Sequence, residues 1–128
     1  MVVTKGYMNE PNFVYGRYFK VLYTNADCFS NKSNYLLDLL SSLESKPSVI
    51  AITEINSKLR LNKKQESEYN IDGYNIFSSN VGNSSFRGII VYVKNSIQAS
   101  QIELSSDFKE CLLIQLRLIN GGSLYVCM

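Results

Sequence analysis

The chain of 128 residues contains no histidine and no tryptophan. Without histidine these residues cannot form a Ser-His-Asp triad, a histidine general base or a zinc site built on imidazole. Long apolar runs are missing as well, because the longest, such as Val49–Ile52 and Ile89–Val93, fall far short of the ~20 residues that a membrane-spanning helix needs. These absences exclude histidine chemistry within the chain and predict no membrane-spanning helix in it.

Charge of one sign is also scarce. Lysine and arginine occur 13 times and aspartate and glutamate 11 times, which leaves a formal net charge of +2 at pH 7. A protein that binds nucleic acid through its overall field is usually more basic. Any interaction with nucleic acid must therefore depend on a local site. A hydrophobic fraction of 45% can bury a core, which excludes an intrinsically disordered chain.

Cysteine is present three times, at Cys28, Cys111 and Cys127, without CxxC spacing. An odd number of this kind favours reduced thiols in an intracellular protein over a disulfide framework. Cys111 and Cys127 are predicted to be small core residues and not nucleophiles. No basic start followed by an apolar stretch marks a signal peptide. We therefore expect an intracellular protein, nuclear or cytoplasmic, that does not associate with a membrane.

Residues 1–18 show neither a helical nor a strand period and carry several turn-forming residues, so an irregular extension outside the core is predicted there. The pattern changes at Phe19. A strand rich in β-forming residues over 19–23 is followed by a leucine-rich helix with Ser30 as its N-cap, and then by a continuous apolar strand over 49–53. This order is typical of a βαβ unit whose second strand is buried on both faces.

The second half of the chain carries four more segments typical of strands, over residues 73–77, 88–93, 112–119 and 123–128. Asn120-Gly121-Gly122 separates the last two and is a strong hairpin signal. The polar stretch over 56–70 is predicted to be a long exposed connection, and the small polar residues over 78–87 predict a mobile loop. Together with the βαβ unit, these strands predict an α/β fold.

Two polar residues stand at the ends of predicted strands. Asn25 follows the first strand of the βαβ unit, and Glu54 ends the second. Sites in α/β proteins gather at the carboxyl ends of strands, so these residues would lie side by side if the strands are adjacent and parallel. An amide and a carboxylate are hard oxygen ligands that suit Mg²⁺ or Mn²⁺. The spacing alone leaves an alternative open, in which Glu54 is a solvated loop residue and Asn25 forms a turn.

Six segments occur in an order and spacing that match one known family. They are Lys20–Ala26, Asn31-Lys32 at the start of the helix, Lys46–Glu54, Gly73-Tyr74, Arg87–Lys94 and Glu110–Ile114. Over residues 19–128 they resemble the endonuclease/exonuclease/phosphatase superfamily, and most of all the apurinic-type endonuclease domains of non-LTR retrotransposons.

The resemblance implies a metal-dependent phosphodiesterase that acts on DNA with Mg²⁺ or Mn²⁺. It assigns Asn25 to the site around the phosphate and Glu54 to the metal, and these are the catalytic residues that it places in this chain. Cleavage of a phosphodiester builds charge on oxygen atoms that a divalent cation stabilises. Arg87 either contacts a DNA phosphate or is an ordinary loop arginine. Glu110 either holds loops near the site or is a surface glutamate.

The family also has a Tyr, an Asp-x-Asn pair, a later Asp and a Ser-Asp-His triplet beyond these segments, and none of them is present here. The resemblance therefore implies a truncated domain over 19–128, the amino-terminal half of a catalytic domain. Its fold would be a partial four-layer sandwich: half of a β-sandwich flanked by helices, with parallel and antiparallel strands mixed.

We expect such a chain to be inactive alone and to need the missing carboxyl-terminal half, or a partner that covers the open sheet. Two alternatives on the same α/β scaffold stay open at this stage. One is a non-catalytic binding module, and the other is a remnant open reading frame.

Overall fold

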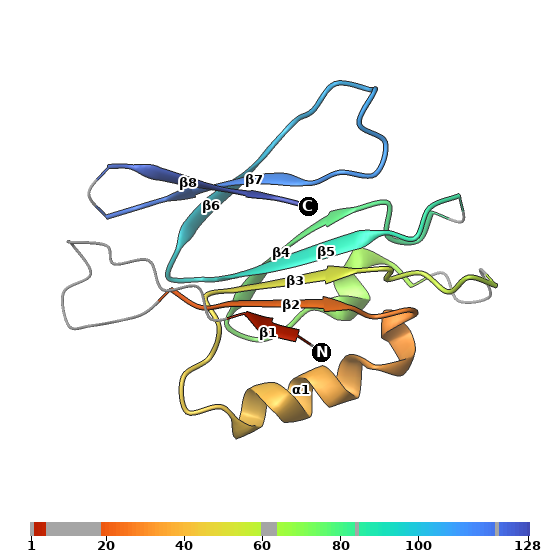
Figure 1. Ribbon diagram of the computed structural model, residues 1–128, viewed down its shortest axis with the longest axis horizontal. Helices are drawn as coiled ribbons and strands as arrows, with labels where there is room; N and C mark the ends of the chain where they lie inside the picture. Colours follow the sequence, from red (N-terminus) through yellow and green to blue (C-terminus); the bar gives the residue numbers. More distant parts are fainter. Residues whose placement is uncertain (1, 5–18, 60–63, 84, 120) are drawn as a thin grey trace.

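The computed structural model describes residues 2–4, 19–59, 64–83, 85–119 and 121–128. In this part of the chain, one α-helix, α1 (Ser33–Ser42), accompanies two β-sheets (Figure 1). The strands are β1 (Val2–Thr4), β2 (Val21–Asn25), β3 (Val49–Thr53), β4 (Tyr74–Ser79), β5 (Ile89–Lys94), β6 (Gln98–Ile102), β7 (Leu113–Arg117) and β8 (Ser123–Cys127). The predicted mixed α/β fold is confirmed at this level. No helix among these residues is long and apolar enough to cross a membrane.

The larger sheet has the strand order β1-β2-β3-β5-β4. Its centre has the predicted βαβ arrangement, because β2 and β3 are joined through α1 and pair in parallel, with Asn25 opposite Thr53. The other pairs in this sheet are antiparallel. Almost every residue of β3 and β5 is buried. A strand covered on both faces has no polar side, which explains their unbroken apolar sequences.

Alternate residues of β3 and β5 point to opposite faces of the larger sheet and pack into two separate hydrophobic clusters. On one face Ile50 packs in the same cluster as Leu36 of α1. On the other face Val49 packs in the same cluster as Ile114 of β7. The helix therefore covers one face of the larger sheet and the smaller sheet covers the other (Figure 1).

The helix begins at Ser33, after a separate 3-10 turn, η1 (Phe29–Asn31), so the prediction that Ser30 caps it is wrong. Phe29 causes the difference, because its ring is buried and stacks on Tyr69, with 5.2 Å between ring centroids. Tyr69 ends a second 3-10 turn, η2 (Glu66–Tyr69), within the connection predicted to be exposed. Its carbonyl accepts a hydrogen bond of 2.6 Å from the Tyr92 hydroxyl of β5.

Two strands differ from the prediction. Residues 1–18 were predicted to be irregular, but β1 lies within them and pairs antiparallel with β2. A strand of three residues is too short to show a period, and residues 1 and 5–18 lie outside the described part. β6 was not predicted, because its half-exposed sequence contains two glutamines and a serine. Its pairing with β7 makes it a strand nonetheless.

The smaller sheet has the order β6-β7-β8, and its hairpin is confirmed by the antiparallel pairing of β7 with β8. The prediction that Cys111 and Cys127 lie in the core is wrong. Cys111 is half-buried and Cys127 is exposed, and their sulfur atoms lie 3.9 Å apart as free thiols. Cys127 belongs to β8, whose residues are exposed or half-buried, and it pairs with Leu113 of β7. Neither thiol therefore contributes to the buried clusters.

Candidate functional site

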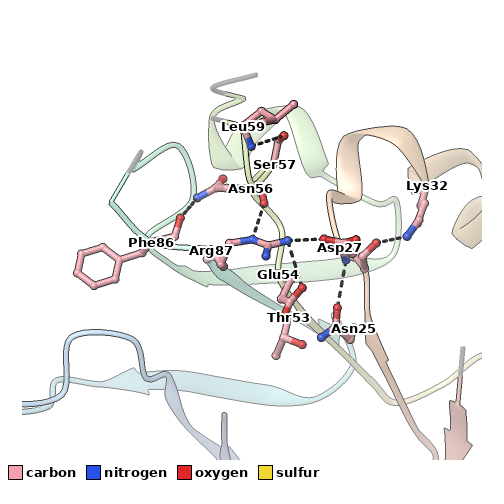
Figure 2. A network of polar contacts seen from close by, with 12 residues as sticks. Asn25, Asp27, Lys32, Thr53, Glu54, Asn56, Ser57, Leu59, Phe86 and Arg87 are labelled. Atoms are coloured by element: carbon pink, nitrogen blue, oxygen red, sulfur yellow. Dashed lines mark hydrogen bonds and ion pairs between the residues drawn. The ribbon is translucent and has the colours of Figure 1, made fainter. Parts of the chain in front are cut away.

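The carboxyl ends of β2 and β3 lie next to the start of β5, and three loops meet there. They are formed by residues 25–29, by residues 54–57, and by residues 80–83 and 85–88 (Figure 2). Backbone hydrogen bonds join the first two loops beyond the end of the strands, for example from Cys28 N–H to the carbonyl of Glu54 at 2.9 Å. The third loop is joined by a bond of 2.6 Å from Asn56 N–H to the carbonyl of Arg87. Backbone hydrogen bonds therefore join all three loops.

The two residues predicted to form the site lie at this edge of the sheet. Asn25 is the last residue of β2, and Glu54 directly follows β3. Their side chains have different partners, and no hydrogen bond joins them in the described residues. Asn25 Oδ1 accepts a bond of 3.1 Å from Asp27 N–H, which closes a tight turn after the strand. Glu54 Oε2 lies 3.1 Å from Arg87 Nη2.

Arg87 connects two carboxylates through one nitrogen atom. Its Nη2 donates to Asp27 Oδ1 at 2.6 Å and lies 3.1 Å from Glu54 Oε2, while its Nε donates to the carbonyl of Asn56 at 3.0 Å (Figure 2). The Arg87 side chain is 26% exposed, against 57% for Asp27 and 34% for Glu54. The group is therefore open to solvent on its Asp27 side and more covered at its centre.

The Asp27 carboxyl has a pKa below its usual value. The hydrogen bond from Arg87 is the largest cause, and the positive charge of Lys58 is the next. Loss of solvation is the third-largest contribution and opposes them, while the charges of Arg87 and Lys32 lower the pKa by smaller amounts. Asp27 is thus an ionised carboxylate at neutral pH, as ligation of a cation requires.

The backbone at this edge is strained. The φ angle is +43° at Asp27, +80° at Cys28 and +57° at Glu54. Residues other than glycine rarely adopt positive φ, and each such residue costs on the order of 1–3 kcal/mol. Strain of this kind clusters at functional sites. Here the two strained residues that carry carboxylates contact the same guanidinium.

Asn56 organises the third loop from a buried position. The residue is only 7% exposed, and its Nδ2 shares two hydrogens among three backbone carbonyls, those of Asn80, Asn83 and Phe86, at 2.9, 3.2 and 2.9 Å. Its Oδ1 accepts from Gly82 N–H at 3.2 Å. A buried amide with this many partners fixes the shape of a loop that has little hydrophobic packing of its own.

Glu110 fixes the same loop from the other side. Its Oε1 accepts hydrogen bonds from the backbone N–H groups of Arg87 and Gly88, at 2.9 and 3.0 Å. Of the two roles considered for Glu110, the structure therefore supports the one that holds loops. Gly88 has φ +78°, and a Cβ there would lie 3.2 Å from Asn56 Nδ2. The absence of a Cβ at Gly88 therefore leaves room for the Asn56 side chain next to the backbone that follows Arg87.

Asp27 and Asn56 were not singled out from the sequence. Asp27 was not considered for the site, although it lies two residues after Asn25 and puts a carboxylate at the end of the same strand. That spacing is a signal that could have found it. Asn56 gives no such signal, because its role depends on burial that a polar residue after a strand does not announce.

A cavity of about 240 Å³ opens beside Asn25. Phe29 and Leu36 form part of its apolar wall. Lys32, the N-cap residue of α1, and Tyr35, within α1, also line it. Tyr35 is 71% exposed. Lys32 Nζ donates to the carbonyl of Ala26, which keeps the ammonium group close to the strand end. The site thus continues into a hollow that has both an aromatic ring and a cation.

The donor set can be tested against a metal ion. In the residues that the structure describes, no three His, Cys, Asp or Glu side chains gather in one place. Asp27 and Glu54 are two such side chains, and both of their carboxylates contact the same guanidinium nitrogen of Arg87. Mg²⁺ is commonly bound by one or two carboxylates, with waters and substrate phosphates completing the shell. The pair therefore fits Mg²⁺ or Mn²⁺, and it lacks the nitrogen and sulfur ligands of a zinc site.

Two comparisons with known proteins give no relative for this chain: no protein-family model matches it, and no curated protein matches it. Its interpretation therefore depends on the geometry of the site and on the residues themselves.

Proposed function

We propose that this chain provides the cation- and phosphate-binding part of a Mg²⁺- or Mn²⁺-dependent phosphodiesterase that acts on DNA. The observation that carries the proposal is the convergence of Asp27 and Glu54, from loops after two adjacent parallel strands, on one guanidinium nitrogen. Two carboxylates in this position are suited to a hard cation. The resemblance to the endonuclease domains of non-LTR retrotransposons supports the same chemistry.

The proposal includes the fold. In a four-layer sandwich two sheets pack face to face and helices cover their outer sides. The helix α1, the larger sheet and the smaller sheet follow one another in that order (Figure 1). This order supports a partial four-layer sandwich in which α1 and the two sheets form three of the four layers.

Each residue of the site has a role in this proposal. Asp27 and Glu54 would hold the cation, whose charge would stabilise the phosphate oxygens during cleavage. Asn25 keeps the Asp27 loop closed through its Oδ1, and its Nδ2 group can donate to a phosphate oxygen. Arg87 can bind a phosphate through its planar fork of N–H groups.

The cavity beside Asn25 gives room for a neighbouring nucleotide. Lys32 can bind the next phosphate as a point charge. The exposed ring of Tyr35 can stack on a base, an interaction that tolerates any sequence. This arrangement fits a protein of low net charge, because recognition comes from a local group of side chains.

The residues expected to bind cation and DNA are present in this chain, whereas the residue expected to activate water for cleavage is not. The resemblance assigns activation of water to a histidine, and the 128 residues contain none. We therefore expect these residues to bind a divalent cation and DNA without cutting the DNA alone. Cleavage would need residues supplied by a carboxyl-terminal half or by a partner.

The test is a titration of the purified chain with Mn²⁺, followed by the loss of the electron paramagnetic resonance signal of free Mn²⁺. We expect saturable binding, and a loss of affinity on the order of tenfold or more in Glu54→Gln, because even the outer-shell partners of metal ligands typically change metal affinity by about 10- to 100-fold when they are replaced. Glu103→Gln is the matched control, since Glu103 is an exposed glutamate outside the site.

A second arm of the experiment measures binding of a short fluorescent DNA duplex by anisotropy, with Mg²⁺ or with chelator. We expect Mg²⁺ to strengthen binding in the wild type and not in Glu54→Gln. A wild type that binds neither Mn²⁺ nor DNA overturns the proposal and leaves the non-catalytic scaffold as the better interpretation. Chelator-sensitive nicking of plasmid by the chain alone would contradict the separation of binding from cleavage.

A further inference from the structure

Arg87 holds both carboxylates of the candidate site with a single nitrogen atom. We infer that Arg87 is an internal counter-ion that competes with a divalent cation for Asp27 and Glu54, and that pairs with a nucleic-acid phosphate in the cation-bound form. The inference rests on the proposed function and adds to it an order of events at the site. Arg87 thereby couples the binding of cation and phosphate.

The competition follows from space. Asp27 Oδ1 and Glu54 Oε2 lie 2.6 and 3.1 Å from Arg87 Nη2, so the two oxygens are no further apart than the sum of these distances. A cation that takes both of these oxygens as ligands at about 2.0–2.1 Å would use the oxygen lone pairs that now face Nη2, and the guanidinium would lie next to it. The two positive groups cannot share these oxygens. Arg87 must therefore release at least one carboxylate when the cation binds.

The backbone of Arg87 is fixed, so the side chain has to make the change. Its N–H is bound to Glu110 and its carbonyl to Asn56 N–H, at 2.9 and 2.6 Å. The side chain is 26% exposed and can turn its guanidinium outward. This movement breaks its bonds to Asp27, Glu54 and the Asn56 carbonyl. The freed fork matches two oxygens of a phosphate, which can replace these bonds.

The charges favour the same exchange. Asp27 and Glu54 carry two negative charges, of which Arg87 balances one. A bound divalent cation balances both, and the guanidinium beside it then meets a charge of its own sign. A phosphate at the surface next to the site restores an opposite charge for Arg87. Cation and phosphate therefore strengthen each other's binding, and by linkage the effect is equal in both directions.

A purely structural arginine gives the opposite expectation. If Arg87 served only to hold the loops of Asp27 and Glu54 in place, its removal would loosen the carboxylates and weaken the binding of a cation. The sign of the effect of removing Arg87 therefore separates the two interpretations, without any measurement of cleavage.

The experiment titrates Mn²⁺ in the absence of DNA into the wild type, Arg87→Gln and Arg117→Gln. Arg117 is the matched control, because it is an exposed arginine on β7. We expect Arg87→Gln to bind Mn²⁺ more tightly, by about 5- to 10-fold, within the range of typical coupling between two sites. We expect no change in Arg117→Gln. In Arg87→Gln, Mg²⁺ should no longer strengthen the binding of a DNA duplex. Weaker or unchanged Mn²⁺ binding by a folded Arg87→Gln variant overturns the inference.

A second measurement has its main readout in the wild type, with one variant as a control. The Nε–H signal of Arg87 in a ¹H–¹⁵N spectrum should shift on addition of Mg²⁺, because its bond to the Asn56 carbonyl is released. The Glu54→Gln variant should show a much smaller shift. A wild type that binds Mn²⁺ while this signal stays unchanged contradicts the inference and leaves the proposed function intact. A wild type that binds no Mn²⁺ contradicts both.

Discussion

The three loops at the carboxyl ends of β2 and β3 differ from the β7–β8 hairpin in how their backbone is held. The hairpin turns with Gly121 at φ +85°, and a Cβ at that glycine would meet nothing within 4 Å. The loops contain Asp27 and Glu54 at positive φ, where side chains other than glycine are strained. The buried amide of Asn56 and the carboxylate of Glu110 hold the third loop in place, and backbone hydrogen bonds join the three loops to one another.

The difference shows where this chain follows local preferences and where it departs from them. The hairpin uses the residue types that its turn requires, and its pattern is locally consistent. The site loops carry residues with poor local preference in positions set by long-range bonds. Departures of this kind are expected where a protein has a function, since function constrains residues that folding would not choose.

The first and largest test of this comparison replaces Asn56 by alanine. The change leaves three carbonyls and one N–H of the third loop without their partner in a mostly buried position. We expect a loss of about 3 kcal/mol in the free energy of unfolding, from the cost of unpaired buried polar groups. Urea denaturation measures it. Asn75→Ala on the exposed side of β4 is the matched control and should change stability by less than about 0.5 kcal/mol.

The second test compares alanine at two glycines with similar φ. In Gly88→Ala the positive φ has a conformational cost for alanine. In addition, the new Cβ would lie 3.2 Å from Asn56 Nδ2 and 3.3 Å from the Asn80 carbonyl oxygen. Gly121→Ala has the conformational cost alone. We expect losses of about 2–3 kcal/mol for Gly88→Ala and about 1 kcal/mol for Gly121→Ala. Equal losses in thermal or urea unfolding would remove the distinction between the two regions.

The third test asks whether Glu54 stores strain. Glu54→Gly and Glu54→Gln both remove the carboxylate, but only the glycine relieves the φ of +57°. We expect the glycine variant to be more stable than the glutamine variant by about 1 kcal/mol. Both should lose Mn²⁺ binding. If the glutamine variant proves the more stable of the two, the backbone at Glu54 is not strained as we describe.

The smallest effect concerns the ionisation of Asp27. Its pKa lies below the usual value because Arg87 donates a hydrogen bond to it, so its contribution to stability is present above the ordinary aspartate pKa and is lost as pH falls through the lowered value. In Arg87→Gln the Asp27 pKa should return toward its usual value. A titration of the Asp27 carboxyl carbon by NMR measures this pKa in the wild type and in the variant. A pKa that does not rise in the variant would show that Arg87 is not the main cause.

The fold could be predicted where the residue pattern of a segment reflects its own local preference for helix, strand or turn. The continuous apolar run of β3, the leucines of α1 and the glycines of the hairpin each indicate their own element. β1 could not be predicted because three residues show no period, and β6 could not because its polar sequence becomes a strand only by pairing with β7.

The candidate site could be predicted in part for the same reason. Asn25 and Glu54 are visible because each stands at the end of a recognisable strand. The part played by Asp27 depends on a left-handed backbone, and that of Asn56 on burial, neither of which residue type reveals. The position of Arg87 between two carboxylates arises from loops that are distant in sequence, so it appears only in the folded chain.

The most direct test of the central claim is Mn²⁺ binding by Asp27→Asn, Glu54→Gln and the double variant, with Asp38→Asn as the control on the exposed face of α1. If both carboxylates ligate one ion, each single variant loses most of the affinity and the double variant loses little more, because residues that share a ligand are not additive. Single variants that bind Mn²⁺ as tightly as the wild type would contradict the account.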